Sequence, residues 1–175
     1  MTHSEISNPL MIDQIRRELA AASNLDDYAG FGQVYVCIVK LALAEPDPEE
    51  FARIKTLAGR LSDPQVSRIL QLPQVDDLLD IKPPLETILC HKNEELRSIE
   101  TAEAIEILRS SRNSKPRKAL RSLLFLLKNI RNKVKHGFKS PEGPRDREIL
   151  SAARPIVVAI AESCLAMRLP LREAK

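Results

Sequence analysis

Apolar residues recur at helical spacing over the first forty residues of the chain. An Asn-Pro pair at residues 8–9 supplies an N-cap and a first-turn proline, and the apolar residues after it keep helical spacing to about residue 22. Asp26 or Asp27 can cap a second helix over residues 28–42. The middle of that segment, QVYVCIV, is rich in β-branched residues like a buried strand. Because the apolar pattern runs for about 17 residues with no pairing strand nearby, we expect a helix.

Residues 47–92 contain shorter apolar segments, each opened by a proline. Asp47-Pro48, Asp63-Pro64 and Pro73 begin the predicted short helices, and Pro83-Pro84 ends the last of them. Their spacing is uneven and no motif recurs at a fixed period, which excludes a repeat array. We therefore interpret 47–92 as a short-helix insertion or cap.

Residues 96–170 hold three longer predicted helices. The first has an expected inner stripe of Leu96, Ile99, Ala102, Ile105 and Leu108. The second begins near Pro116, carries Leu120, Leu123, Leu124, Leu127, Ile130 and Val134 on its inner face, and ends at Gly137. The third runs from about Pro144 to Leu169, and Pro155 is expected to kink it.

Composition favours the same all-α class. Among 175 residues there are 4 Phe, 2 Tyr, no Trp and 5 Gly, so the core must come mostly from aliphatic side chains and few tight hairpin turns are possible. Neither GxGxxG nor GxxxxGK[ST] occurs, which argues against a phosphate-cradling nucleotide enzyme. We expect one helical domain over 1–175, with 96–170 as its main long-helix unit.

Charge is strongly segregated along the chain. Residues 107–141 contain eleven Lys or Arg and no Asp or Glu, whereas the remainder holds sixteen basic residues against all 24 acidic ones, a net charge of −8. Such a basic segment on an acidic body indicates a surface for polyanions. The alternative is a basic helix that contacts its own acidic body or an acidic protein partner.

The cysteines and two of the histidines point to no metal or redox chemistry. Cys37, Cys90 and Cys164 are widely spaced among apolar residues, which favours buried thiols in a reducing cytoplasm. His3 lies near the beginning of the sequence, and His91 lacks neighbouring ligands. We expect no metal and no cofactor. No signal peptide is evident, and the longest strictly apolar run, 34–39, is far shorter than a membrane span, so we expect a soluble protein.

His136 is different, because it closes the most basic helix in the string KNIRNKVKHG (128–137). Asn132 and His136 are four residues apart and share a helical face, and the long side chain of Arg131 can reach that face. An imidazole can transfer a proton near neutral pH, and a guanidinium can clamp phosphate oxygens. These groups suffice for attack of a ribose 2′-hydroxyl on the adjacent phosphorus without a metal. A basic last helical turn is also common in inert proteins.

The string Arg131-Asn132-x-x-x-His136, late in a helical chain and followed by a polar loop and a long helix, resembles the signature of the HEPN superfamily. This resemblance covers about residues 117–168. It implies a compact helical bundle, usually a homodimer, in which the Arg and His motifs of two protomers form one composite site. Many HEPN proteins are metal-independent endoribonucleases of toxin–antitoxin or antiviral systems, and others only bind. One departure is Phe138, at a position where nucleotidylated HEPN toxins carry a tyrosine.

The sequence therefore leads to a ranked set of functional hypotheses. The first is a homodimeric HEPN ribonuclease that leaves a 2′,3′-cyclic phosphate, with a possible antitoxin or nucleotidyltransferase partner. Its expected catalytic residues are Arg131, Asn132 and His136, and its expected RNA contacts are Arg121, Lys128, Lys133, Lys135 and Lys139. The second is a non-catalytic HEPN module that binds RNA or regulates. The third is an adaptor for an acidic protein partner.

Overall fold

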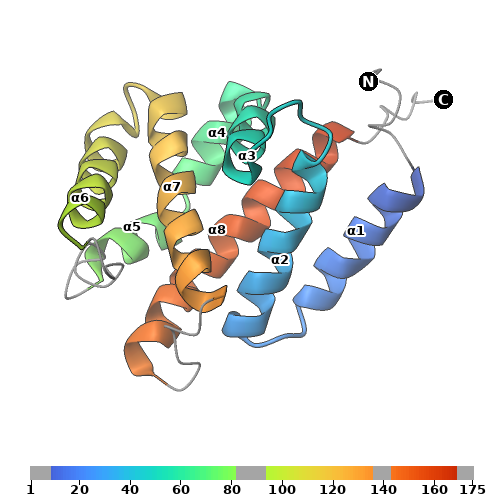
Figure 1. Cartoon of the computed structure of the whole chain (residues 1–175), viewed down its shortest axis with the longest axis horizontal. Coiled ribbons are helices and arrows are strands. Elements are labelled where there is room, and N and C mark those ends of the chain that lie inside the picture. Colours follow the sequence, from blue (N-terminus) through green and yellow to red (C-terminus); the bar gives the residue numbers. More distant parts are fainter. Residues whose placement is uncertain (1–8, 82–93, 136–142, 169–175) are drawn as a thin grey trace.

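The computed structural model describes residues 9–81, 94–135 and 143–168, which form eight helices and no strand. The helices are α1 (Pro9–Ala22), α2 (Asp27–Ala42), α3 (Glu50–Gly59), α4 (Asp63–Leu70), α5 (Pro73–Asp80), α6 (Glu94–Ser111), α7 (Pro116–Lys135) and α8 (Pro144–Arg168). The all-α expectation is confirmed (Figure 1). The positions of His3, Cys90, His91, His136, Phe138 and Lys139 lie outside the described residues.

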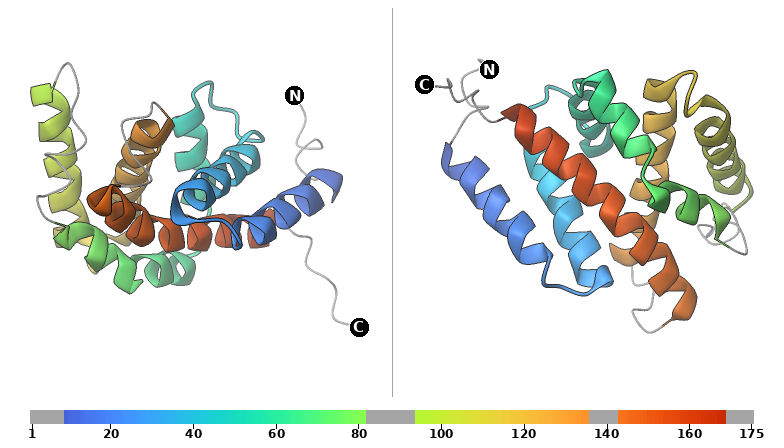
Figure 2. Two further views of the ribbon diagram at one scale, coloured as in Figure 1. Left: turned by 90° about the horizontal axis from the view of Figure 1, so that it is seen from below. Right: turned by 180° about the vertical axis from the view of Figure 1, so that it is seen from behind.

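Helices α2 and α8 lie against each other at the centre of the molecule (Figures 1 and 2). The β-branched middle of α2 is helical, and Phe31, Val34 and Ile38 from this helix are buried. Asp26 caps α2 by accepting a hydrogen bond from the backbone N–H of Ala29 at 2.8 Å. Helix α8 continues through Pro155 without a break in helical conformation. The two central helices thus supply much of the surface on which α1, α3, α5 and α7 pack.

The remaining helices surround this pair. Helix α1 packs on α2 and α8 at one edge, and α6 packs mainly on α7 at the opposite edge (Figure 1). Helix α7 also contacts α2, α3 and α4. The short helices α3, α4 and α5 bury Ile54, Leu57, Val66, Ile69, Val75 and Leu78 in the same core as the long helices. The segment expected to be an insertion therefore contributes directly to that core.

Two expectations about the helices differ from the structure, one about where α3 begins and one about which face of α6 is buried. Helix α3 begins at Glu50 and not at Asp47-Pro48, whose backbone carbonyls instead accept hydrogen bonds from the Arg53 guanidinium. Among the side chains of α6 that the structure describes, the expected stripe is right only at Ile105 and Leu108, which are buried, because Ile99 is 52% exposed and Ala102 is also exposed. A strict three-residue spacing drifts around a helix of 3.6 residues per turn, so those five positions cannot share one face. The buried face is Thr101, Ala104, Ile105 and Leu108.

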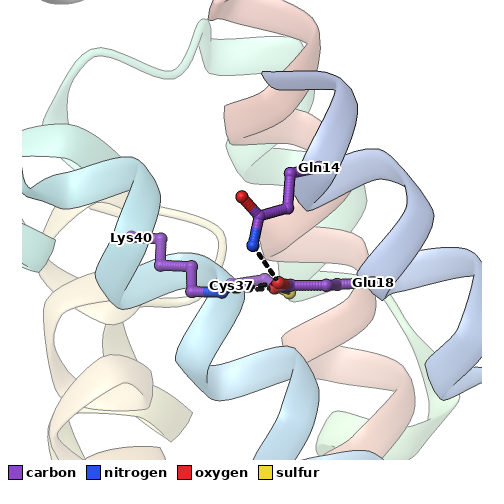
Figure 3. Close-up of polar contacts among 4 residues, drawn as sticks. All are labelled: Gln14, Glu18, Cys37 and Lys40. Carbon is purple, nitrogen blue, oxygen red and sulfur yellow. Dashed lines mark hydrogen bonds and ion pairs between the residues drawn. The ribbon is translucent and has the colours of Figure 1, made fainter. Parts of the chain in front are cut away.

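A polar cluster fastens α1 to α2 (Figure 3). Lys40 donates to both carboxylate oxygens of Glu18 at 2.6 and 2.7 Å, and Gln14 donates to the same carboxylate at 2.9 Å. The Lys40 contact holds the pKa of Glu18 below its ordinary value. The buried Cys37 thiol lies 3.7 Å from Glu18, and burial raises its pKa to about 11. This thiol is therefore protonated at neutral pH.

Within the described residues, α8 is the helix with the length and apolar composition needed to cross a membrane. However, 61% of that stretch is buried inside the protein, as in the core helix of a globular domain. Its buried side chains include Ile149, Ile156 and Ile160. The burial of α8 is thus explained by its packing on α2 and α5.

Candidate functional site

Arg131 lies near the end of α7, at the seam where α7 meets α2 and α3. The inward-facing residues Leu127 and Ile130 anchor this part of α7 in the core and leave Arg131 at its edge. The Arg131 side chain is 20% exposed.

Three neighbours hold the Arg131 guanidinium. Its Nη2 atom lies 3.3 Å from Glu50 Oε1 in an ion pair, and Nη1 donates to Asn132 Oδ1 at 3.3 Å. The guanidinium carbon lies 5.3 Å from the centre of the Tyr35 ring, in cation–π range. A carboxylate, an amide and an aromatic ring therefore fix the direction of this cation. We call Tyr35, Glu50 and Asn132 the Arg131 cradle.

Tyr35 forms the buried wall of the cradle. The residue is only 4% exposed, and burial raises the pKa of its phenol well above the ordinary value, with Arg131 opposing the shift. The ring is therefore neutral at physiological pH and presents an apolar, electron-rich surface to Arg131. Phe31 supports it in α2, with ring centres 6.2 Å apart.

The sequence did not identify Tyr35 and Glu50 as parts of this site. Tyr35 lies within the apolar string QVYVCIV, and Glu50 is one of several acidic residues near the beginning of α3. Each lies more than eighty positions from Arg131 in sequence, so no local spacing could link them. The only usable signal was the placement of Glu50 in the first helical turn.

The structure brings together Arg131 and Asn132 of the expected catalytic set. Asn132 is half-buried and accepts its hydrogen bond from Arg131, so it orients the guanidinium directly. The Tyr28 hydroxyl donates to the carbonyl of Val134 at 3.2 Å, which ties the last described turn of α7 to α2. The expected pairing of Asn132 with His136 lies outside the described residues.

The expected RNA-contacting residues of α7 do not share one environment. Arg121 and Lys135 are exposed, and Lys128 is half-buried with its ammonium 4.7 Å from the centre of the Phe51 ring. These three residues are seven apart and form one stripe along α7. Lys133 differs, because it is only 8% exposed on the inner side of the helix. Its burial does not fit an open phosphate contact, and a count of basic residues could not reveal this.

A shallow hollow of about 450 Å³ opens between α3 and α7. Lys55, Arg60 and Arg121 supply positive charge to its lining, and Asp47 supplies one carboxylate. The hydroxyl of Thr56 donates to Asp47 at 2.6 Å. The hollow therefore has an excess of positive charge.

No group of three or more His, Cys, Asp or Glu side chains suited to a metal ion occurs in the part of the chain that the structure describes. No family model, curated protein or solved structure matches this chain. The arrangement around Arg131 can bind an anion that approaches from solvent and competes with Glu50.

Proposed function

We propose that this protein is a metal-independent endoribonuclease of HEPN type that acts as a homodimer in the cytoplasm. The observation that carries the proposal is the Arg131 guanidinium, which is held beside Asn132 on a side chain that is 20% exposed. The basic stripe on the same helix and the Arg-Asn-x-x-x-His resemblance support it. A toxin or defence role, with an antitoxin or nucleotidyltransferase partner, belongs to the same proposal.

Each residue has a distinct role in the proposed reaction. Arg131 binds the non-bridging oxygens of the scissile phosphate and stabilises the charge that develops on them. The 2′-hydroxyl oxygen attacks phosphorus, the bond to the 5′ oxygen breaks, and a 2′,3′-cyclic phosphate and a 5′-hydroxyl result. His136 transfers a proton, taking it from the nucleophile or giving it to the leaving oxygen. Asn132 keeps the guanidinium in place. The motif of a second protomer completes the composite site.

Incubation of the purified protein with total RNA in EDTA tests the proposal. We expect cleavage with 2′,3′-cyclic ends. The variants His136→Ala and Arg131→Ala should each lower the rate by about 10²–10⁴-fold, and Asn132→Ala should lower it by less. Arg131→Lys keeps the charge but not the planar fork, so it should remain strongly impaired. Arg16→Ala, at an exposed position on α1, is the matched control and should cleave normally.

One observation favours a second candidate, a non-catalytic HEPN module that binds RNA. The Glu50 carboxylate already neutralises Arg131 in this structure, so a phosphate must displace it or share the guanidinium. Wild-type protein that binds RNA in a salt-dependent way but leaves it intact would favour this module. Cleavage that persists unchanged in His136→Ala would instead indicate a contaminating nuclease and refute the proposed site.

A further inference from the structure

The hollow between α3 and α7 lies beside the Arg131 cradle but shares no residue with it. Of its three cations, Lys55 lies in the middle of α3, Arg60 directly follows the end of α3, and Arg121 lies on α7. Lys55 and Arg121 are exposed, so their charged ends are accessible to a ligand. Asp47 is the one acidic residue in the lining.

Hydrogen bonds and an ion pair of Arg117 hold the backbone at one side of the hollow. The Arg117 guanidinium donates to the carbonyl oxygens of Gly59 at 2.8 Å and Leu61 at 3.1 Å, and it pairs with Asp63 at 2.8 Å. These contacts join the beginning of α7 to the end of α3, where Gly59 lines the hollow. The spacing between the backbone segments that carry the cations of α3 and α7 is therefore set before any ligand binds.

Arg60 keeps positive charge at the hollow although it has a carboxylate partner. It lies 2.7 Å from Glu45, whose side chain is fully buried. Arg168 also pairs with Glu45, at 2.5 Å. Two guanidinium groups thus share one carboxylate, which leaves this trio with a net charge of +1. By formal charge, Lys55, Arg60 and Arg121 of the lining exceed Asp47 by two positive charges, and the carboxylate that faces Arg60 is shared with Arg168.

A line of cations joins the hollow to Arg131. Phe51 has the Lys55 ammonium 5.1 Å from its ring centre and the Lys128 ammonium 4.7 Å from it, so it links the two helices. Along α7, Arg121, Lys128 and Arg131 span ten residues, or about 15 Å at 1.5 Å per residue. At about 3.4 Å per stacked nucleotide, this length corresponds to roughly four nucleotides.

We propose that the α3–α7 hollow binds backbone phosphates of a single RNA strand about four nucleotides from the phosphate held by Arg131. This inference rests on the proposed function for the identity of the strand. The hollow offers ammonium and guanidinium groups with no aromatic platform of its own, which suits phosphates and gives no base readout. Its role is to hold and align the strand, so short oligonucleotides that reach only Arg131 do not use it.

The test compares Lys55→Gln/Arg121→Gln with the control Arg16→Gln/Arg17→Gln, which removes two exposed cations from α1 at the far edge. The probes are single-stranded DNA oligonucleotides of 12 and 4 nucleotides, which cannot be cleaved because they lack the 2′-hydroxyl. For the 12-mer we expect the hollow variant to bind about tenfold more weakly, with a salt slope lower by about 1.4, or 0.7 per lost contact. The control should match wild type, and all proteins should bind the 4-mer alike. Circular dichroism verifies the fold of each variant.

Cleavage of a 12-nucleotide RNA separates this inference from the proposed function. Three results would each overturn the hollow as a phosphate site. They are unchanged affinity of Lys55→Gln/Arg121→Gln for the 12-mer, an equal loss of affinity in both double variants, and no binding of the 12-mer by wild type. Cleavage by wild type would in that case leave the ribonuclease proposal standing. If only Lys55→Gln/Arg121→Gln loses affinity for the 12-mer and wild type leaves the RNA intact, the result would support the hollow as a phosphate site and count against the ribonuclease proposal.

Discussion

Glu50→Gln isolates the effect of the carboxylate that faces Arg131. The side chain keeps its size but loses its charge, and the guanidinium loses its ion-pair partner at 3.3 Å. Glu50 is 41% exposed and Arg131 is 20% exposed, so solvent screens the pair in part. Pairs this open typically contribute about 0.2–1 kcal/mol. We therefore expect the free energy of unfolding to fall by no more than about 1 kcal/mol.

The same energy sets the expected change in affinity. If Glu50 competes with phosphate for Arg131, removing its charge should strengthen the binding of phosphate by up to about 1 kcal/mol, which lowers Kd about fivefold. Fluorescence anisotropy with an uncleavable single-stranded 12-mer measures this gain. Glu49→Gln is the matched control, because Glu49 is an exposed carboxylate one residue away at the same helix N-terminus and makes no side-chain capping bond. Charge and helix-dipole effects are then nearly equal in the two variants.

We expect Glu50→Gln to bind the 12-mer two- to fivefold more tightly than Glu49→Gln at low salt, with the difference shrinking as salt rises. Equal affinities would mean that the ion pair does not limit access to Arg131. Weaker binding by Glu50→Gln would refute the competition argument, because it would show that the carboxylate positions the guanidinium for the ligand.

Two further predictions concern stability. The Lys40 contact lowers the pKa of Glu18, so the ion pair stabilises the fold above the ordinary carboxyl pKa of 4.5, and this stabilisation is lost as pH falls through the lower folded value. Urea titrations should show that Glu18→Gln is less stable than wild type by about 1 kcal/mol at pH 7. This difference in stability should close in acid. Gly30→Ala should destabilise the protein by about 1–2 kcal/mol, because a Cβ at residue 30 would lie 2.8 Å from Nε of Arg154, whose guanidinium is held by hydrogen bonds. A Cβ at Gly32 meets nothing within 4 Å, so Gly32→Ala should stabilise α2 by about 0.5–1 kcal/mol. Thermal denaturation that moves both glycine variants in the same direction would contradict the steric argument.

Helix identity could be predicted from the sequence because long apolar stripes and proline positions are local signals. The middle of α2 was correctly expected to be helical despite its β-branched residues, since its apolar pattern exceeds the length of an ordinary strand. The face of α6 was not predictable in the same way. Polar residues interrupt its apolar positions, and packing against α7 places the polar Thr101 in the buried face.

The candidate site was only partly accessible to sequence reasoning. The motif residues Arg131 and Asn132 are adjacent in sequence, so their contact follows from local structure. Glu50 and Tyr35 reach Arg131 only through the packing of α3 and α2 on α7, which no spacing encodes. Lys133 shows what charge counting leaves out, since a basic residue within a basic segment can still lie on the buried side of its helix.

The pairing of α2 with α8 also has a consequence for the synthesis of the protein. About 100 residues separate the end of α2 from the beginning of α8, so the main partner of α2 is made long after it. At about 5–20 residues per second, a ribosome needs roughly 5–20 s to cover that distance. During this interval the apolar face of α2, which includes Phe31 and Val34, has no α8 to cover it. Tyr35 of the same helix cannot serve as a wall of the Arg131 cradle until α7, which carries Arg131, has also been made.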